Sequence, residues 1–180
     1  MLLRAAEPRD AMAVARVHVR SWQSAYRGLL PELYLSQLRA EDRAGRYDFA
    51  TADPLQPQTL VAVDDGADGP DQPDQPGAPI RGFATVMPSR DADVPDAGEL
   101  CALYVDPEWW GRGYGVALIS AARQQLAERG YNATILWLLE GNVRADRFYR
   151  ADGWLPDGSR RTEGLWGITV NELRYRRALD

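Results

Sequence analysis

The chain has 180 residues, a formal net charge of −5, one cysteine and one histidine. This length is typical of one domain with its own core, so we predict a single domain over residues 1–180. A lone cysteine excludes an internal disulfide. One cysteine and one histidine together are too few soft ligands for a zinc site, so we expect no metal. The acidic balance, without a basic stripe, argues against a nucleic-acid partner.

The sequence also argues against a membrane partner. No apolar run approaches the thickness of a bilayer, and charged residues already occur among the first ten positions, where a signal peptide would become apolar. We therefore expect no membrane span and no secretion signal, and a cytoplasmic location.

The N-terminal half is predicted to contain three strands and two helices. A proline early in a helix and apolar residues at spacings of three and four predict the first helix from about Pro8 to about Ala25. The other predicted elements are a strand at 2–6, a helix at 31–45, and strands at 59–63 and 80–87. The intervening residues 64–79 are rich in Asp, Gly, Gln and Pro, and they cannot bury enough apolar surface to offset their ordering entropy. We expect a mobile acidic hairpin loop there.

The C-terminal half is predicted to begin with a central strand at 99–105, followed by a glycine-rich turn and a helix that ends near Gly130. The apolar run at 134–139 predicts a strand parallel to the central one, joined to it through the helix in a right-handed βαβ unit. A helix at 143–151 and one or two antiparallel strands within 165–176 complete the chain. The order β-α-α-β-β-β-α-β-α-β predicts a mixed α/β sheet with helices on both faces. An exposed C-terminal strand can pair between subunits, which leaves a homodimer open.

The turn Gly111-Arg112-Gly113-Tyr114-Gly115 is the most informative motif. Alternate glycines allow close approach of a ligand, and the first amides of the following helix form an anion site, so a phosphate or pyrophosphate is the expected guest. The turn lacks the Gly-Lys-Ser/Thr of a nucleotide P-loop and the G-x-G-x-x-G of a dinucleotide fold. A glycine-rich turn that serves packing alone is the alternative.

The turn and its surroundings resemble the GNAT superfamily, the acyl-coenzyme-A-dependent N-acetyltransferases, whose pyrophosphate loop is Gln/Arg-x-x-Gly-x-Gly/Ala. The similarity extends to the segments Leu103-Tyr104-Val105-Asp106-Pro107-Glu108, Asn142, Phe148-Tyr149 and Gly153-Trp154. Trp110 departs from the pattern, because it stands where the family usually has Gln or Arg. The resemblance implies a GNAT-like fold with a splayed central pair of parallel strands, and acetyl-CoA as co-substrate.

The resemblance also implies which residues hold acetyl-CoA. The main chain of Leu103 and Val105 would pair with the pantetheine arm in the gap between the splayed strands. Asn142 is either a helix cap or a pantetheine contact. Tyr104 is either a contact of the donor or a residue of the core. The full implied set is Leu103, Tyr104, Val105, Trp110, Gly111, Arg112, Gly113, Tyr114, Gly115, Val116 and Asn142.

Acyl transfer to an amine requires a base, because an ammonium group is not a nucleophile. Glu99 is the candidate base, and strand alternation places it on one face with Cys101, Leu103 and Val105 if no bulge intervenes. The alternative is a solvated glutamate at a strand end. The family places a catalytic tyrosine at Tyr149, where the phenol would protonate the departing thiolate, whereas periodicity alone would make Tyr149 a core residue.

The acceptor side is predicted more weakly. Trp22 and Tyr26 lie in a helical region that forms part of the acceptor wall in GNAT proteins, and they are candidate substrate contacts, with packing favoured for Trp22. His18 is expected to be a partly exposed helix residue rather than a base. Cys101 is expected to be a small core residue, with an acyl-cysteine route left open.

We predict an N-acetyltransferase that transfers an acetyl group from acetyl-CoA to a primary amine by direct attack in a ternary complex. The partner would be a small-molecule or peptide amine. The alternative function is a non-catalytic CoA-binding sensor or partner module with the same fold.

Overall fold

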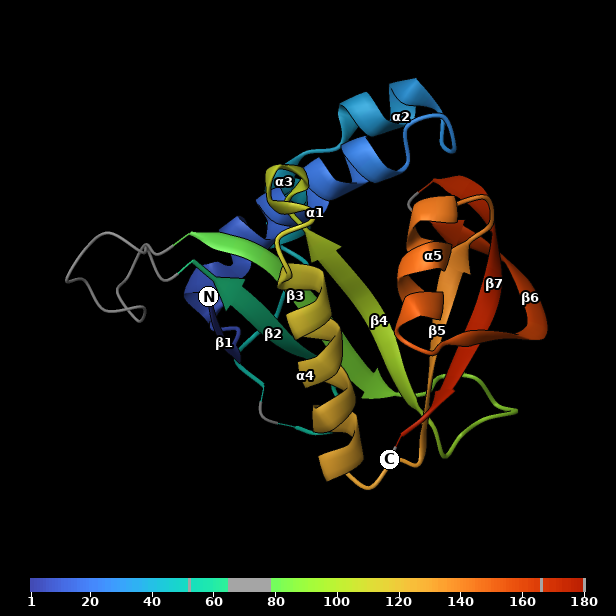
Figure 1. Cartoon of the computed structure of the whole chain (residues 1–180). Coiled ribbons are helices and arrows are strands. Elements are labelled where there is room, and N and C mark those ends of the chain that lie inside the picture. The colour runs from blue at the N-terminus through green and yellow to red at the C-terminus, as the bar shows by residue number, and fades with distance from the viewer. Residues whose placement is uncertain (52, 65–78, 166, 180) are drawn as a thin grey trace.

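The structure is a computed structural model that describes residues 1–51, 53–64, 79–165 and 167–179. Its strands form one seven-stranded sheet in the order β1-β2-β3-β4-β5-β7-β6 (Figure 1). The strands are β1 (Leu2–Ala5), β2 (Gln58–Val63), β3 (Ile80–Pro88), β4 (Gly98–Val105), β5 (Ala133–Leu139), β6 (Leu155–Leu165) and β7 (Ile168–Ala178). The helices are α1 (Ala11–Ala25), α2 (Glu32–Gln37), α3 (Ala40–Ala44), α4 (Tyr114–Glu128) and α5 (Val143–Ala151), with 3-10 turns η1 (Pro8–Asp10) and η2 (Pro107–Trp109).

The sheet is mixed, as predicted. β4 and β5 run parallel and are connected through α4, whereas the other neighbouring pairs among the described strands are antiparallel. A crossover helix between parallel neighbours is what the apolar run at 134–139 indicated. The mixed α/β architecture is therefore confirmed.

Helices cover both faces of the sheet. Phe83 and Ala84 are adjacent on β3 and so point to opposite faces. Phe83 packs with Val14 of α1, whereas Ala84 packs in a second cluster with Leu118 and Ile119 of α4, which α5 also joins. Burying a side chain of the size of leucine contributes about 1.5–3 kcal/mol, so these clusters fix the helices on the sheet.

Two elements differ from the sequence prediction. The helix predicted at 31–45 is broken into α2 and α3, because Leu38 and Arg39 are extended and Leu38 packs against the core cluster around Trp22. β6 was not predicted, since it begins Leu155-Pro156-Asp157-Gly158 and is mostly exposed, and its pairing with β7 makes it a strand. Of the loop predicted at 64–79, residues 65–78 lie outside the described residues.

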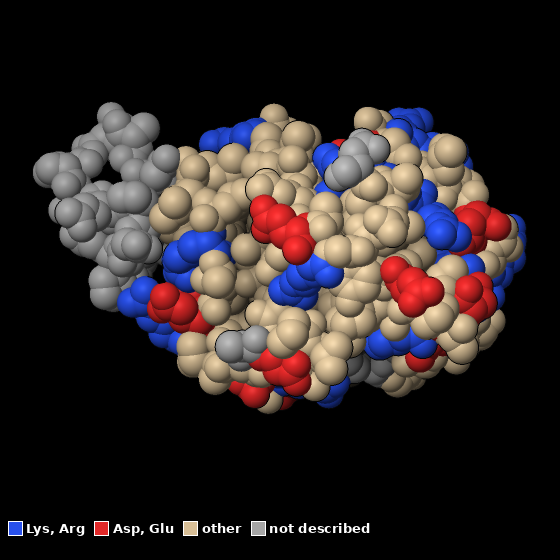
Figure 2. All heavy atoms as spheres, turned by 90° about the horizontal axis from the view of Figure 1, so that it is seen from below, with Lys and Arg blue, Asp and Glu red and all other residues tan. Residues whose placement is uncertain are grey.

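Within the described part of the chain, no helix is long and apolar enough to cross a membrane. On the face shown in Figure 2, acidic and basic side chains are interspersed. Such mixed charge is typical of a solvated surface.

Candidate active site

β4 and β5 separate soon after they begin. Parallel pairing joins them at Gly98 with Thr134 and at Glu99 with Ile135, and the strands diverge beyond these pairs (Figure 1). A cavity of about 1030 Å³ opens where they part, lined by both strands, by the loop before α4, and by α1 and α5. The splayed central pair implied by the family resemblance is therefore confirmed.

A β-bulge at Cys101 changes which face each residue of β4 occupies. On β3, Thr85 pairs with Ala102 while the next residue, Val86, pairs with Leu100, so Cys101 has no opposite partner. Beyond the bulge Leu103 shares the α4-side cluster with Leu100, which simple alternation would have put on opposite faces. The predicted alternation of Glu99, Cys101, Leu103 and Val105 is therefore wrong, and Glu99 lies on the face opposite Leu103.

The register of β4 on β3 also decides which main-chain groups face the gap. The Asp106 N–H donates to the Arg81 C=O at 2.7 Å, and Tyr104 is paired with Phe83. Because antiparallel residues alternate between the two sides, the N–H and C=O groups at positions 103 and 105 point away from β3 and towards the gap. An extended ligand can bond to groups in this position.

The loop before α4 has the backbone of an anion cradle. Gly111 and Gly113 have φ values of 74° and 85°, in the left-handed region that favours glycine. α4 begins directly afterwards, and its first amides lack partners within the helix. A Cβ on Gly115 would lie 3.3 Å from the ring of Phe148, so α5 packs closely against the start of α4. The loop therefore has the backbone geometry that an anion site at a helix start requires.

Trp110 crosses from this loop to the end of β4. Its indole N–H donates to the Val105 C=O at 2.8 Å, and the Ser21 hydroxyl donates to the same oxygen, also at 2.8 Å. The Arg144 guanidinium lies 3.3 Å from the centre of the Trp110 ring. The side chain that replaces the usual Gln or Arg is thus held in place by β4 on one side and α5 on the other.

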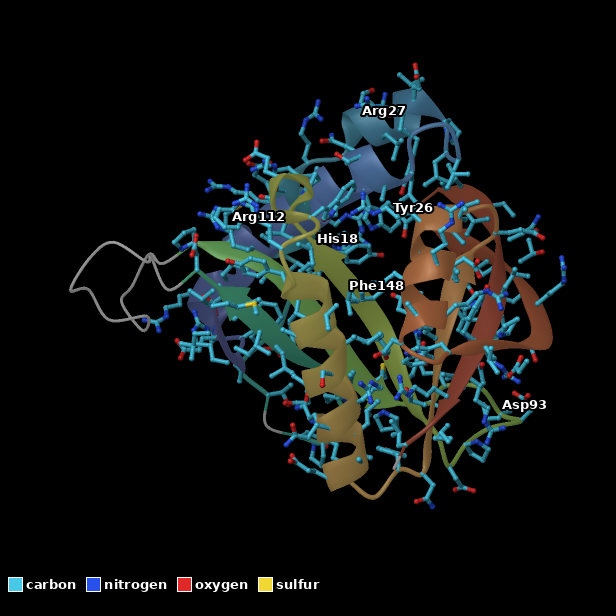
Figure 3. The ribbon with its side chains drawn as sticks, viewed as in Figure 1. His18, Tyr26, Arg27, Asp93, Arg112 and Phe148 are labelled. Carbon is cyan, nitrogen blue, oxygen red and sulfur yellow. The ribbon has the colours of Figure 1, made fainter. Side chains whose placement is uncertain are left out.

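Two other loop side chains face away from the cavity. The Arg112 guanidinium lies over the Trp109 ring at 4.6 Å, at the N-terminal end of α4 (Figure 3). Tyr114 is buried and meets Trp109 edge to face. Neither Arg112 nor Tyr114 lines the cavity.

Glu99 lies at the closed end of the gap, where β4 and β5 still pair. Its side chain is only 3% exposed, and Arg90 binds both carboxylate oxygens, with N–O distances of 2.6 and 3.1 Å. This contact raises the pKa of Arg90. Glu99 and Arg90 both line the cavity. The solvated glutamate considered as an alternative is not what the structure contains.

The loop that carries Arg90 is anchored by a buried arginine of β7. Arg174 is 6% exposed on its side chain, and it binds Asp91 at 2.9 Å, Asp93 at 2.6 Å and Asp157 at 2.7 Å. The indole N–H of Trp137 on β5 also donates to Asp91 at 3.0 Å. These contacts hold the loop between β3 and β4 across the neighbouring strands and position Arg90.

Tyr149 lies on α5 and reaches the cavity from the opposite side to α1. Asn142 caps the helix by accepting a hydrogen bond from the Ala145 N–H at 3.1 Å, which is the predicted capping role. Burial raises the pKa of Tyr149, with a smaller effect of Tyr104, so the phenol keeps its proton at neutral pH. Among the described residues no group is hydrogen-bonded to the Tyr149 hydroxyl.

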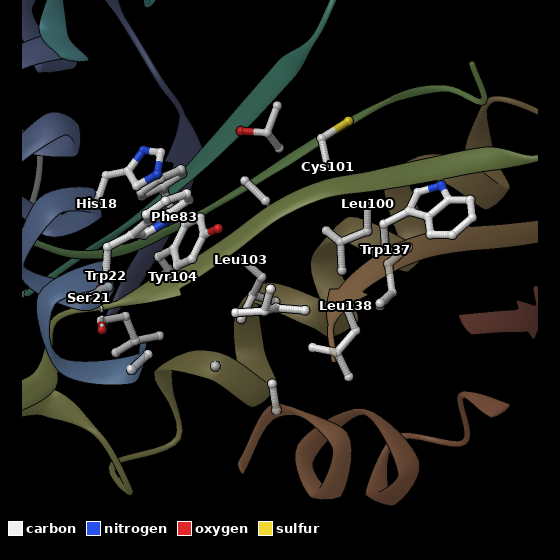
Figure 4. Close-up of a pocket in the computed structure, with 18 of the residues that line it drawn as sticks. His18, Ser21, Trp22, Phe83, Leu100, Cys101, Leu103, Tyr104, Trp137 and Leu138 are labelled. Carbon is white, nitrogen blue, oxygen red and sulfur yellow. Dashed lines mark hydrogen bonds between the residues drawn. The ribbon is translucent and has the colours of Figure 1, made fainter. Parts of the chain in front are cut away.

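Aromatic side chains form the other end of the cavity. His18 stacks on Tyr104 with ring centres 4.8 Å apart, and the Tyr26 and Tyr104 hydroxyls lie 3.4 Å apart. Trp22 is buried and meets Tyr26 edge to face at 4.9 Å. Figure 4 shows His18, Trp22, Phe83 and Tyr104 gathered at one end of the cavity, and Leu100, Trp137 and Leu138 at the other.

Two titratable groups in the cavity are held neutral. Burial, aided by Arg43, lowers the pKa of His18 to about 3, and His18 is 7% exposed, so its predicted partial exposure is wrong. Burial, with a smaller effect of Glu99, raises the pKa of the Cys101 thiol to about 12. A thiol that keeps its proton is a poor nucleophile, which disfavours an acyl-cysteine route.

The family model for the acetyltransferase (GNAT) family matches residues 20–154, from within α1 to just beyond α5. The chain belongs to the GNAT family. This confirms the resemblance inferred from the glycine loop and the enzyme class that it implied.

Individual GNAT relatives agree with this assignment. The uncharacterized N-acetyltransferase YuaI of Bacillus subtilis (strain 168) is 26% identical over 140 residues, which cover 78% of this chain and 72% of that protein. The structure of the PaiA N-acetyltransferase of Thermoplasma acidophilum, in complex with coenzyme A, has a TM-score of 0.73 and 17% identity, and 98% of each chain is covered. The yncA structure of Salmonella typhimurium, with acetyl-CoA, has a TM-score of 0.67 and 14% identity over 100% of this chain and 94% of that one. At these identities the two structures show the fold that this GNAT chain shares.

Most of the residues predicted for the GNAT site surround the same cavity. They are Trp22, Tyr26, Glu99, Leu103, Tyr104, Val105, Trp110, Gly111, Gly113, Gly115, Val116, Asn142 and Tyr149. The sequence reasoning missed Arg90, Arg144, Arg161 and Glu172, which also line it. Of these four residues, only Arg144 could have been found from the sequence, because it lies inside the motif that begins at Asn142. The others are brought in by strands and loops remote from any motif.

Proposed function

We propose that this GNAT enzyme transfers an acetyl group from acetyl-CoA to a primary amine by direct attack in a ternary complex. The observation that carries the proposal is the gap between β4 and β5, where the main chain of β4 beyond Glu99 pairs with no described strand on that side. The cavity that opens there is lined by the glycine loop, by Glu99 at the closed end of the gap and by the aromatic residues at the other end. Solved relatives that hold coenzyme A or acetyl-CoA support the donor.

The acceptor amine would enter from the aromatic chamber. The rings of Tyr26 and Tyr104 provide faces that can hold a cationic or flat group. Burial is the main cause that raises the pKa of both phenols, and the negative charge of Glu172, which also lines the cavity, raises it further. The chamber therefore suits an amine with an apolar or aromatic body, in a small molecule or at the end of a peptide.

Two protons must move in this reaction. The ammonium group loses one proton to Glu99, directly or through water, and the free amine attacks the acetyl carbonyl carbon. The attacking nitrogen loses its second proton as the tetrahedral intermediate collapses and the carbon–sulfur bond breaks. The leaving sulfur receives a proton from the Tyr149 hydroxyl, and the second amine proton, carried through water, restores that hydroxyl. Arg90 acts as a positioning residue, because its guanidinium binds both oxygens of Glu99 and holds the side chain at the closed end of the gap.

The test compares Glu99→Gln with Glu172→Gln, since both replace a carboxylate that lines the cavity and is paired with an arginine. Initial rates of acetyl transfer over a panel of aromatic and aliphatic amines should fall about 100-fold or more in Glu99→Gln. Acetyl-CoA binding, measured by calorimetry, should stay within about twofold of wild type in both variants. A large loss of rate in Glu172→Gln alone would move the base to Glu172.

Tyr149→Phe tests the proton donor. The rate constant kcat should fall about 100-fold with little change in acetyl-CoA affinity, because the phenol acts on the leaving sulfur and not on the bound donor. An unchanged kcat would return Tyr149 to a packing role.

We further propose that residues 1–180 form one domain, since the described strands build a single sheet.

A further inference from the structure

The cradle lacks the Gln or Arg that the family usually places at position 110, and the structure contains a cation beside the side chain that stands there. The Arg144 guanidinium lies 3.3 Å from the centre of the Trp110 ring. Arg144 lines the same cavity as Gly111, Gly113 and Gly115. Because α5 also packs Phe148 against Gly115, Arg144 and Phe148 share a helix face that is turned towards the loop.

Arg144 has no anionic partner within the described residues. The carboxylates that precede the loop are already engaged, because Arg20 binds Asp106 at 3.1 Å and Glu108 at 3.0 Å. Partial removal from water lowers the pKa of Arg144, and no carboxylate of the described chain offsets this. An arginine that is stacked on an indole and left without an acid partner, in a protein of net charge −5, indicates an anionic ligand.

We propose that Arg144, held against Trp110, binds the pyrophosphate of the donor and replaces the missing side chain of the loop. Trp110 is the positioning residue: its indole N–H is bonded to Val105, and its ring supports the guanidinium. A guanidinium presents a planar fork that matches phosphate oxygens, and stacking limits the freedom it must lose on binding. This inference rests on the proposed use of acetyl-CoA.

The test is calorimetric binding of acetyl-CoA, 3′-dephospho-CoA and S-acetylpantetheine to wild type, Arg144→Ala and Arg147→Ala. Arg147 is the matched control, because it is an exposed arginine of the same helix that does not line the cavity. Removing a charge-assisted contact should weaken acetyl-CoA binding about 10- to 100-fold in Arg144→Ala and less than about twofold in Arg147→Ala. The same factor should apply to 3′-dephospho-CoA, and S-acetylpantetheine should bind both variants as it binds wild type.

A second variant examines the role of Trp110. In Trp110→Gln the Arg144→Ala change should have a smaller effect than in wild type, because the guanidinium has lost its support, and a double-mutant cycle measures this coupling. Thermal unfolding of each variant checks that all are folded.

The outcomes separate this inference from the proposed function. If wild type does not bind acetyl-CoA at all, the proposed function is wrong and the inference fails with it. If wild type binds and Arg144→Ala binds equally well, only the inference is overturned. Equal weakening towards S-acetylpantetheine would show that Arg144 acts through packing, and loss of the effect with 3′-dephospho-CoA would assign Arg144 to the 3′-phosphate instead. Either result overturns the pyrophosphate assignment.

Discussion

Replacing Arg174 with alanine should destabilise the protein more than any exposed ion-pair change. Arg174 is 6% exposed on its side chain and binds Asp91, Asp93 and Asp157. Removing it leaves Asp91 and Asp157, which are 17% and 18% exposed, without their cation. Breaking a buried pair costs about 3–5 kcal/mol, and the partial exposure of these carboxylates favours the lower end, about 3 kcal/mol. For a chain of this length the melting temperature should fall by about 6–12 °C.

The assay is urea unfolding at neutral pH, with thermal unfolding as a second measurement, and Arg160→Ala is the control. Arg160 lies on the neighbouring strand β6 and pairs with Glu140, with side-chain exposures of 69% and 45%. An exposed pair of this kind contributes about 0–1 kcal/mol. Equal losses of unfolding free energy in Arg174→Ala and Arg160→Ala would refute the argument from burial.

The same variant has a defined pH dependence. Hydrogen bonds from Arg174 lower the pKa of Asp93 below its ordinary value of 3.8. A carboxyl whose pKa is lowered by folding contributes stability that is complete above its unfolded pKa and is lost as the pH falls through the folded value. The stability difference between wild type and Arg174→Ala should therefore be constant from about pH 5 to 7 and shrink below about pH 4.

Substitutions at three further positions test other parts of the structure. Gly82→Ala should lower the unfolding free energy by about 1–3 kcal/mol in urea titrations, because the new Cβ would lie 2.9 Å from the main-chain oxygen of Tyr104; an unchanged value would contradict this packing. Cys101 should react slowly with iodoacetamide below pH 10, since its pKa is about 12, and Cys101→Ala should keep its transfer rate within about threefold; fast alkylation at pH 8 would reopen the acyl-cysteine route. Asn142→Ala should cost about 1 kcal/mol in unfolding free energy through loss of the cap on α5, whereas Asn142→Asp should keep most of it.

The central part of the site could be predicted because its signals are local. Gly111 and Gly113 adopt positive φ values, which few other residues tolerate, so the sequence itself marks the turn and the start of α4. Asn142 bonds to an amide three residues further on, and this cap is likewise visible from the sequence.

The parts that could not be predicted depend on partners far away in the sequence. The bulge at Cys101 exists only in the register between β4 and β3, and nothing in the residues around it indicates a bulge. The Arg90–Glu99 pair requires the loop before β4 to be held by Arg174, which is about eighty residues further along the chain. His18 is a polar residue buried among aromatic rings. The helical pattern of the sequence alone could not show that Tyr104, which is remote in the sequence, covers it.

The scarcity of pairing between β4 and β5 also has a mechanical consequence. In the part of the chain that the structure describes, the sheet has two parts, one formed by β1 to β4 and the other by β5, β7 and β6. These parts pair strand to strand only at Gly98 and Glu99. A ligand that bonds to both parts would connect β4 and β5 along the length where they do not pair, and would make the whole sheet more rigid. At a hundredfold excess over its dissociation constant it would add about 2.7 kcal/mol of stability, which hydrogen exchange should detect as far away as the outer strands β1 and β6.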